Sequence, residues 1–122
     1  MSSGIDTLCK ETMIIVMATV VRYEIIYAPV VKNHMKAIER RYHSLIRQAI
    51  EGRLSFEPLV ETRNRKPLKR AAMGATWEIR FGPNNRFRVF YRVDQKERRV
   101  FVLAIGEKRG NCLRIGGEEI EI

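Results

Sequence analysis

Apolar and polar residues alternate between Thr76 and Val93, which predicts two strands joined by a turn. Residues 83–85 are Pro-Asn-Asn, so we expect a three-residue loop with Asn85 in the left-handed conformation that such loops require. Facing residues then have numbers that add up to 168. In this register one face is wholly apolar and carries Trp77, Ile79, Phe81, Phe87, Val89 and Tyr91.

The opposite face of the hairpin pairs Arg80 with Arg88 and Glu78 with Phe90. A four-residue loop would place apolar side chains beside arginines on both faces, which is disfavoured wherever one face is buried. Cβ atoms of directly opposed residues lie about 5 Å apart, and like charges in that arrangement destabilise a sheet. The repulsion between two arginines there is roughly 1 to 3 kcal/mol. The pair could be solvated or separately matched by carboxylates, or it could bind a polyanion.

A second apolar pattern, from Val30 to Glu51, has the spacing of an amphipathic helix, and Gly52 is a suitable C-terminal stop. Its stripe comprises Val31, Met35, Ile38, Tyr42, Leu45 and Ala49, widened by Ile46 and Ile50. His43 falls on the solvent face and His34 on the flank. We therefore do not expect a histidine base.

The remaining segments predict further strands and a connection. The apolar run Met13–Val21 is too short for a membrane span and lacks the flanking charge of a signal peptide, so it predicts a first strand that continues to Tyr27 and ends at Pro29. Residues 52–75 predict a connection with a possible short helix and a charged loop at 63–70. Asp94–Arg99 predicts a polar turn, and Val100–Ile105 a central strand covered on both faces.

These elements predict an α+β fold. An N-terminal strand and a three-strand meander form a small, mostly antiparallel sheet, with one long helix and a possible short second helix on one face. We expect residues 1–16 to be an N-terminal extension or the start of the first strand, residues 17–119 a single domain, and residues 120–122 a short tail. Translation could begin at Met1, Met13 or Met17.

Positive charge is concentrated around the hairpin. The net charge of the chain is +9, and residues 61–92 contain nine basic residues against Glu61 and Glu78. Such a surface suits a phosphate backbone, an acidic protein or a membrane surface, of which nucleic acid is the commonest partner. Two distant cysteines without metal-ligand spacing indicate neither a disulfide scaffold nor a zinc site, and they fit a reducing cytoplasm. No cofactor or metal is indicated.

Several motifs, in order and spacing, resemble the RelE/ParE superfamily of toxins from bacterial type II toxin-antitoxin systems. They are Asn64–Lys69, Trp77–Gly82, Arg86–Tyr91, Leu103–Gly106 and Gly116–Glu119. The resemblance covers roughly residues 20–119. It implies a RelE-like fold, a cognate antitoxin as partner, and a toxin that acts either on messenger RNA in the ribosome (the RelE branch) or on DNA gyrase (the ParE branch).

If the chain belongs to the RelE branch, it is a metal-independent endoribonuclease that inhibits translation, with the ribosome and messenger RNA as partners. Residue by residue, the resemblance places Arg80 and Arg88 at the scissile phosphate. The loop before the second strand of the hairpin region also contributes to the active site in some relatives, which points to Lys66 and Lys69. Either lysine could transfer a proton if neighbouring cations lower its pKa. Glu78, on the same face as Arg80, is a further candidate and is equally suited to relieve the arginine repulsion. Candidate RNA-binding residues are Arg65, Arg86, Phe90, Lys108 and Arg109. Phe90 could stack a base or pack within the sheet.

One departure from the RelE branch is that residues 107–122 contain no tyrosine or histidine, one of which several of its nucleases use as base or stacking residue. Two alternatives therefore stay open. The chain could be a ParE-like gyrase inhibitor, or a nucleic-acid-binding module whose arginines position phosphates without chemistry.

Overall fold

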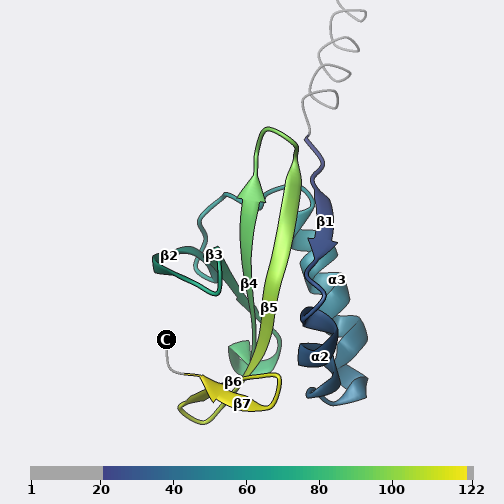
Figure 1. Cartoon of the computed structure of the whole chain (residues 1–122), viewed down its shortest axis with the longest axis vertical. Coiled ribbons are helices and arrows are strands. Elements are labelled where there is room, and N and C mark those ends of the chain that lie inside the picture. Colours follow the sequence, from purple (N-terminus) through teal and green to yellow (C-terminus); the bar gives the residue numbers. More distant parts are fainter. Residues whose placement is uncertain (1–20, 121–122) are drawn as a thin grey trace, which may run out of the picture.

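The computed structural model describes residues 21–120, which form one mixed sheet with helices on one side (Figure 1). The first strand, β1, spans Glu24–Tyr27. The helices are α2 (Val31–Lys36), a 3-10 turn (Arg40–Tyr42) and α3 (His43–Leu54). The later strands are β2 (Arg65–Ala72), β3 (Ala75–Phe81), β4 (Phe87–Asp94), β5 (Arg99–Arg109), β6 (Cys112–Ile115) and β7 (Glu118–Ile120).

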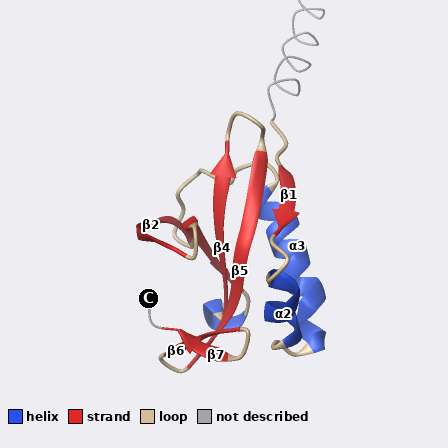
Figure 2. Cartoon of the chain, viewed as in Figure 1, coloured by secondary structure: helices blue, strands red, loops and turns tan. Residues whose placement is uncertain are grey.

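Strands β2 to β7 pair in chain order, each antiparallel to the next, and β1 pairs in parallel with the first part of β5. The sheet is strongly curled, and α2 and α3 lie along one side of it (Figure 2). The expected α+β architecture, a mostly antiparallel sheet with helices packed on one face, is therefore confirmed. The predicted first strand lies partly outside the described residues, and β1 is its described portion. No described helix is both long and apolar enough to cross a lipid bilayer.

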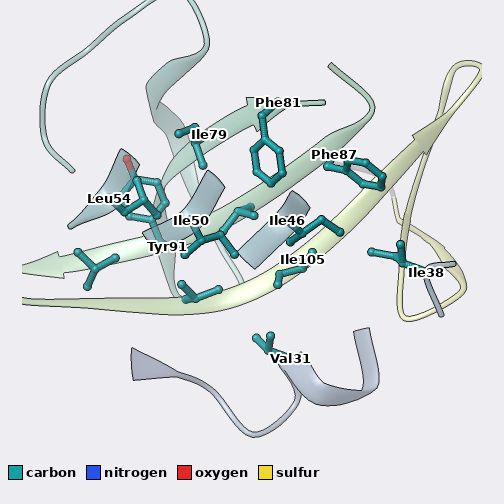
Figure 3. Close-up of a cluster of buried hydrophobic side chains, with 13 residues drawn as sticks. Val31, Ile38, Ile46, Ile50, Leu54, Ile79, Phe81, Phe87, Tyr91 and Ile105 are labelled. Atoms are coloured by element: carbon teal, nitrogen blue, oxygen red, sulfur yellow. The ribbon is translucent and has the colours of Figure 1, made fainter. Parts of the chain in front are cut away.

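The main core lies between the helices and the sheet. Ile46, Ile50 and Leu54 recur at intervals of four residues along α3 and are fully buried. Figure 3 shows them meeting side chains of β3, β4 and β5, including Phe81, Phe87 and Ile105. The apolar face predicted for the hairpin is the sheet's contribution to this core.

The predicted hairpin register is confirmed. Strands β3 and β4 pair Arg80 with Arg88 and Phe81 with Phe87, as the sum of 168 requires. The turn occupies Pro83–Asn85, and Asn85 has φ 54°. Gly82 precedes this turn with φ 85°, a conformation that favours glycine, and a Cβ there would lie 2.7 Å from the Phe87 ring. Turn chemistry and alternation together therefore fix the register.

The prediction of one uninterrupted helix from Val30 to Glu51 is wrong. Helix α2 ends at Lys36, and Glu39 is extended with ψ 135°, so the chain turns before α3 begins at His43. His43 is half-buried rather than solvated, because its Nε2 hydrogen-bonds the carbonyl of Ile38 at 2.8 Å, next to the break. Helix α3 also continues through Gly52 to Leu54. Burial of Leu54 outweighs the weak helix propensity of an exposed glycine.

The charged connection is also different from the prediction. Residues 65–72 form strand β2 rather than a loop, and no short helix occurs between residues 56 and 75. Strand β2 pairs with β3 and has an irregular register between Pro67 and Ala72. Proline is tolerated there because β2 is the edge strand of the sheet. At the other end, residues 112–120 form a β-hairpin that the sequence did not predict. Of the predicted tail at residues 120–122, only Ile120 is described, and it is the last residue of β7.

A smaller apolar cluster lies on the second face of the sheet, around Phe90 and Ala104. Leu68 from β2 and Leu113 and Ile120 from the β6–β7 hairpin pack against it. Between Phe90 and Tyr91 the register with β5 shifts by one residue, because Leu103 has no partner in β4. This bulge keeps Val102 in the main core while Ala104 faces the smaller cluster.

Buried His34 connects α2 to the sheet. Its Nδ1 accepts a hydrogen bond from the backbone N–H of Ile105 at 3.2 Å, so the ring is neutral with its proton on Nε2. Burial lowers the pKa of this imidazole. The His34 ring also lies beside Gly116 in the β6–β7 turn, where an added Cβ would lie 3.3 Å from its Cδ2 atom. His34 therefore has a structural role and does not act as a catalytic base.

Candidate anion-binding groove

A groove of about 860 Å³ opens between β2, β3 and β4, the end of β5, and the β6–β7 hairpin. Side chains alternate across a strand, so Arg80 and Arg88 point away from the helices and into this groove. Its charged lining residues are Lys66, Lys69, Glu78, Arg80, Arg88, Lys108 and Glu119.

The two arginines at the centre of the groove have unequal surroundings. Arg80 Nε donates to Glu78 Oε1 at 2.6 Å, and the Glu78 side chain is largely buried beneath it. Arg80 itself retains 43% of its side-chain exposure. Glu78 therefore holds the guanidinium of Arg80 in a fixed direction while leaving part of it open to the groove.

Arg88 has no ion-pair partner among residues 21–120. Its Nε atom is buried without a hydrogen-bond acceptor. Burial, and secondly the nearby charge of Arg80, lower the pKa of the Arg88 guanidinium, whereas Glu78 acts in the opposite direction. A buried donor without an acceptor is costly and uncommon in native proteins. An anion placed between the two arginines would supply the missing acceptor and relieve their repulsion.

Three lysines complete the cationic lining. Lys66 and Lys69 come from β2, and Lys66 lies opposite Glu78 in the β2–β3 ladder. Lys108 comes from the end of β5, where its backbone N–H donates to the carbonyl of Arg86 at 2.7 Å. The groove thus combines five cationic side chains with two carboxylates, those of Glu78 and Glu119. Such a lining suits a ligand carrying more than one phosphate.

Of the ten residues predicted for the site, six lie together in the groove: Lys66, Lys69, Glu78, Arg80, Arg88 and Lys108. Arg65 does not join them. It is buried, and its guanidinium donates to the carbonyls of Val60 and Arg53 at 3.1 and 3.3 Å. Arg65 holds the end of α3 and the following loop, and it is inaccessible to RNA.

Arg86 and Arg109 are also outside the groove. Both pair with the buried carboxylate of Glu107, and Arg86 in addition contacts Glu39 and the Tyr42 ring. Arg86 precedes β4 and has helical φ and ψ angles, so it does not share the alternation that turns Arg88 toward the groove. Glu107 and Arg109 alternate with Lys108 along β5 and therefore lie on the other face of that strand. Of the two neighbouring candidates Lys108 and Arg109, only Lys108 lines the groove.

Phe90 is completely buried in the smaller apolar cluster. It lies on the predicted face, but β2 and the β6–β7 hairpin cover it. Phe90 therefore packs within the sheet and is unable to stack a base.

The sequence prediction missed the hairpin that forms one wall of the groove. Asn111, Cys112, Leu113, Glu119 and Ile120 come from β6, β7 and the turn before them. Cys112 donates from Sγ to Glu119 Oε1 at 2.9 Å, and this contact raises the pKa of the thiol. Gly116-Gly117, a turn signal directly after the mostly apolar segment Cys112–Ile115, could have revealed this hairpin.

Comparisons with known proteins agree with this geometry. Residues 21–111 match the family described as ParE toxin of type II toxin-antitoxin system, parDE. The fold is similar to a chain in the crystal structure of the toxin-antitoxin complex RelBE2 from Mycobacterium tuberculosis, with 26% identity and a TM-score of 0.60. That match covers 72% of this chain and all of the other. No curated protein sequence matches significantly.

Proposed function

The chain belongs to the ParE toxin family of type II toxin-antitoxin systems, and from this premise we propose that it is a ribosome-dependent endoribonuclease that cuts messenger RNA. The observation that carries the proposal is the opposed pair of Arg80 and Arg88, with the Nε of Arg88 buried and lacking an acceptor. Stability alone disfavours this arrangement, whereas a phosphate between the two guanidinium groups would stabilise it.

The proposed reaction is attack of a ribose 2′-hydroxyl on the adjacent phosphorus. A base removes the 2′-hydroxyl proton, a new O–P bond closes a cyclic phosphate, and the 5′-oxygen of the next nucleotide leaves after receiving a proton. The phosphorane oxygens gain negative charge in the transition state. Two guanidinium groups suit these oxygens because arginine stays ionised and donates in a planar fork.

Roles for the other groove residues follow from their positions. Lys66 and Lys69 lie on the strand beside Arg80, from where either ammonium could neutralise a phosphate or give a proton to the leaving oxygen. Lys108 approaches from the opposite wall and would bind a neighbouring phosphate. Glu78 is committed to Arg80 by a short hydrogen bond, so we assign it chiefly to orienting that arginine.

A cognate antitoxin is the second proposed partner. The similar solved structure is of a toxin-antitoxin complex, and the family is defined by such systems. An antitoxin segment of acidic character would complement the charge of +9.

The test is cleavage of messenger RNA on stalled ribosomes by the chain and by Arg80→Ala/Arg88→Ala. We expect the double variant to lose messenger RNA cleavage and growth inhibition while it keeps its fold and its ability to bind the antitoxin. Arg40→Ala/Arg47→Ala removes the same charge from exposed positions on the helical side and should cut normally. Undiminished cleavage by Arg80→Ala/Arg88→Ala would contradict the proposal.

A second candidate function, inhibition of DNA gyrase, is favoured by the family match itself, whose description names ParE. It predicts that the purified chain inhibits gyrase supercoiling while translation proceeds unaffected. RNA binding that falls steeply with salt, without cleavage or gyrase inhibition, would instead indicate a binding module.

A further inference from the structure

Arg92 and Phe101 form a cation–π pair that lies outside the groove. They face each other in the β4–β5 ladder, and Cζ of Arg92 lies 4.2 Å from the centre of the phenyl ring. Arg92 is exposed and Phe101 is half-buried. No described acidic side chain forms an ion pair with Arg92 within residues 21–120. The pair is therefore an accessible cation with an aromatic backing.

The pair shares the face of the sheet that carries the groove. Arg88, Phe90 and Arg92 alternate along β4, so all three point away from the helices. Four residues separate Arg88 from Arg92, a distance of about 13 Å along a strand. An RNA strand whose phosphate lies at Arg88 would therefore reach Arg92 by passing over the smaller apolar cluster that covers Phe90.

The chemistry of the pair suits an unstacked nucleobase. The phenyl ring supports the guanidinium from one side, and the Arg92 residue as a whole is exposed to solvent. Single-stranded RNA is commonly bound by stacking its bases on aromatic rings or on arginine planes. Because the guanidinium is already oriented, stacking a base on it costs little side-chain entropy.

Neighbouring charges argue against an acidic protein segment at this position. Asp94 follows Arg92 on the same face of β4, and Glu24 pairs with Arg99 at 3.4 Å beside it. These carboxylates would repel an acidic side chain at Arg92 and would repel an RNA phosphate there equally, so the group that suits this position is the neutral base rather than a phosphate. We propose that Arg92, backed by Phe101, is a stacking subsite for a nucleobase of the RNA strand whose scissile phosphate lies between Arg80 and Arg88. This inference rests on the proposed function.

Binding of a short, fluorescent single-stranded RNA tests the subsite. Methylation of its 2′-hydroxyls removes the nucleophile, so binding is measured without cleavage. Arg92→Lys keeps the charge and removes the planar group, and we expect it to weaken binding about tenfold. Phe101→Leu should weaken binding in the same direction. Arg99→Lys is the matched control at the same end of the sheet and should bind as the parent does, and circular dichroism checks the fold of each variant.

A second RNA set, with abasic nucleotides introduced one position at a time, identifies the stacked base. At one position the abasic RNA should bind the parent and Arg92→Lys equally well. Equal binding of the intact RNA by both proteins, or a loss that persists with every abasic RNA, would overturn the subsite. A loss of antitoxin binding alone would assign the pair to protein docking and also overturn it.

The two proposals can fail separately. If the parent cuts messenger RNA and Arg92→Lys binds RNA equally well, the subsite is wrong and the proposed function stands. If the parent neither binds nor cuts RNA, the proposed function fails and the subsite fails with it.

Discussion

Arg80 and Arg88 lie directly opposite each other in the β3–β4 ladder, yet only Arg80 has a carboxylate partner within residues 21–120, Glu78 at 2.6 Å. The pair is thus charged beyond what its surroundings neutralise. This asymmetry leads to our first prediction, that the groove reduces the stability of the chain in exchange for binding an anion.

Arg88→Met should raise the free energy of unfolding by about 1 kcal/mol, because it removes the repulsion and a buried donor without an acceptor. Urea denaturation measures this change. Added salt should stabilise the parent more than the variant, since salt screens the repulsion. Arg99→Met, which breaks an exposed ion pair with Glu24, should bring no gain. A destabilised Arg88→Met would contradict the prediction.

Glu78→Gln separates the two roles considered for this carboxylate. Glutamine keeps an acceptor for Arg80 Nε but is unable to take a proton. Because Glu78 already holds Arg80, we expect cleavage to fall by less than tenfold and the free energy of unfolding by about 1 kcal/mol. Single-turnover cleavage across a range of pH measures the first quantity. A loss of a hundredfold or more, with loss of the basic limb of the pH profile, would instead make Glu78 the base.

The neighbours Arg65 and Lys66 should respond in opposite ways. Arg65→Gln removes donors from the carbonyls of Val60 and Arg53, so it should cost about 2 kcal/mol of stability and leave RNA affinity unchanged. Lys66→Gln should leave stability within about 0.5 kcal/mol and weaken RNA binding, with a smaller salt dependence. Thermal unfolding and RNA titration on both variants check the pair. Equal effects of the two substitutions on RNA affinity would contradict their assigned roles.

Stability should fall in mildly acidic solution because of His34. Burial lowers its pKa in the folded state, so below about pH 6.5 the unfolded chain binds more protons at this residue than the folded chain does. The stabilising contribution is complete above that pH and is lost as the pH falls toward the folded-state pKa. The midpoint of urea unfolding between pH 7.5 and pH 5 measures it. In His34→Gln this part of the pH dependence should vanish; if it persists, another group is responsible.

The central hairpin could be predicted from sequence because all its determinants are local. Asn85 and the alternation of Trp77, Ile79 and Phe81 specify the turn and the buried face without reference to the rest of the chain. The same reasoning paired Arg80 with Arg88, whereas Lys66 and Lys69 were added by the resemblance to the RelE/ParE toxins; all four line the groove.

What sequence reasoning missed depends on distant contacts. Strand β2 is polar and contains Pro67, so only its pairing with β3 makes it a strand. Nothing in the sequence separates the structural role of Arg65 from the groove position of Lys66. Arg65 is buried because its guanidinium donates to the carbonyls of Val60 and Arg53, near the end of α3. The break before α3 contains neither glycine nor proline, and it follows from how the two helices pack on the sheet.

The bulge at Leu103 decides which side chains of β5 share a face of the sheet. Phe101 and Lys108 are seven residues apart, an odd number, and a regularly alternating strand would send them to opposite faces. Because Leu103 has no partner in β4, the alternation shifts by one residue there. Phe101 and Lys108 therefore both lie on the face that carries the groove, while Val102 and Ile105 both face the helices. Deleting Leu103 would therefore remove the bulge and leave a regular strand, in which Phe101 and Lys108 are separated by an even number of positions and keep their present face. Deleting any residue that pairs with β4 would instead leave the bulge in place and shift the pairing beyond the deletion.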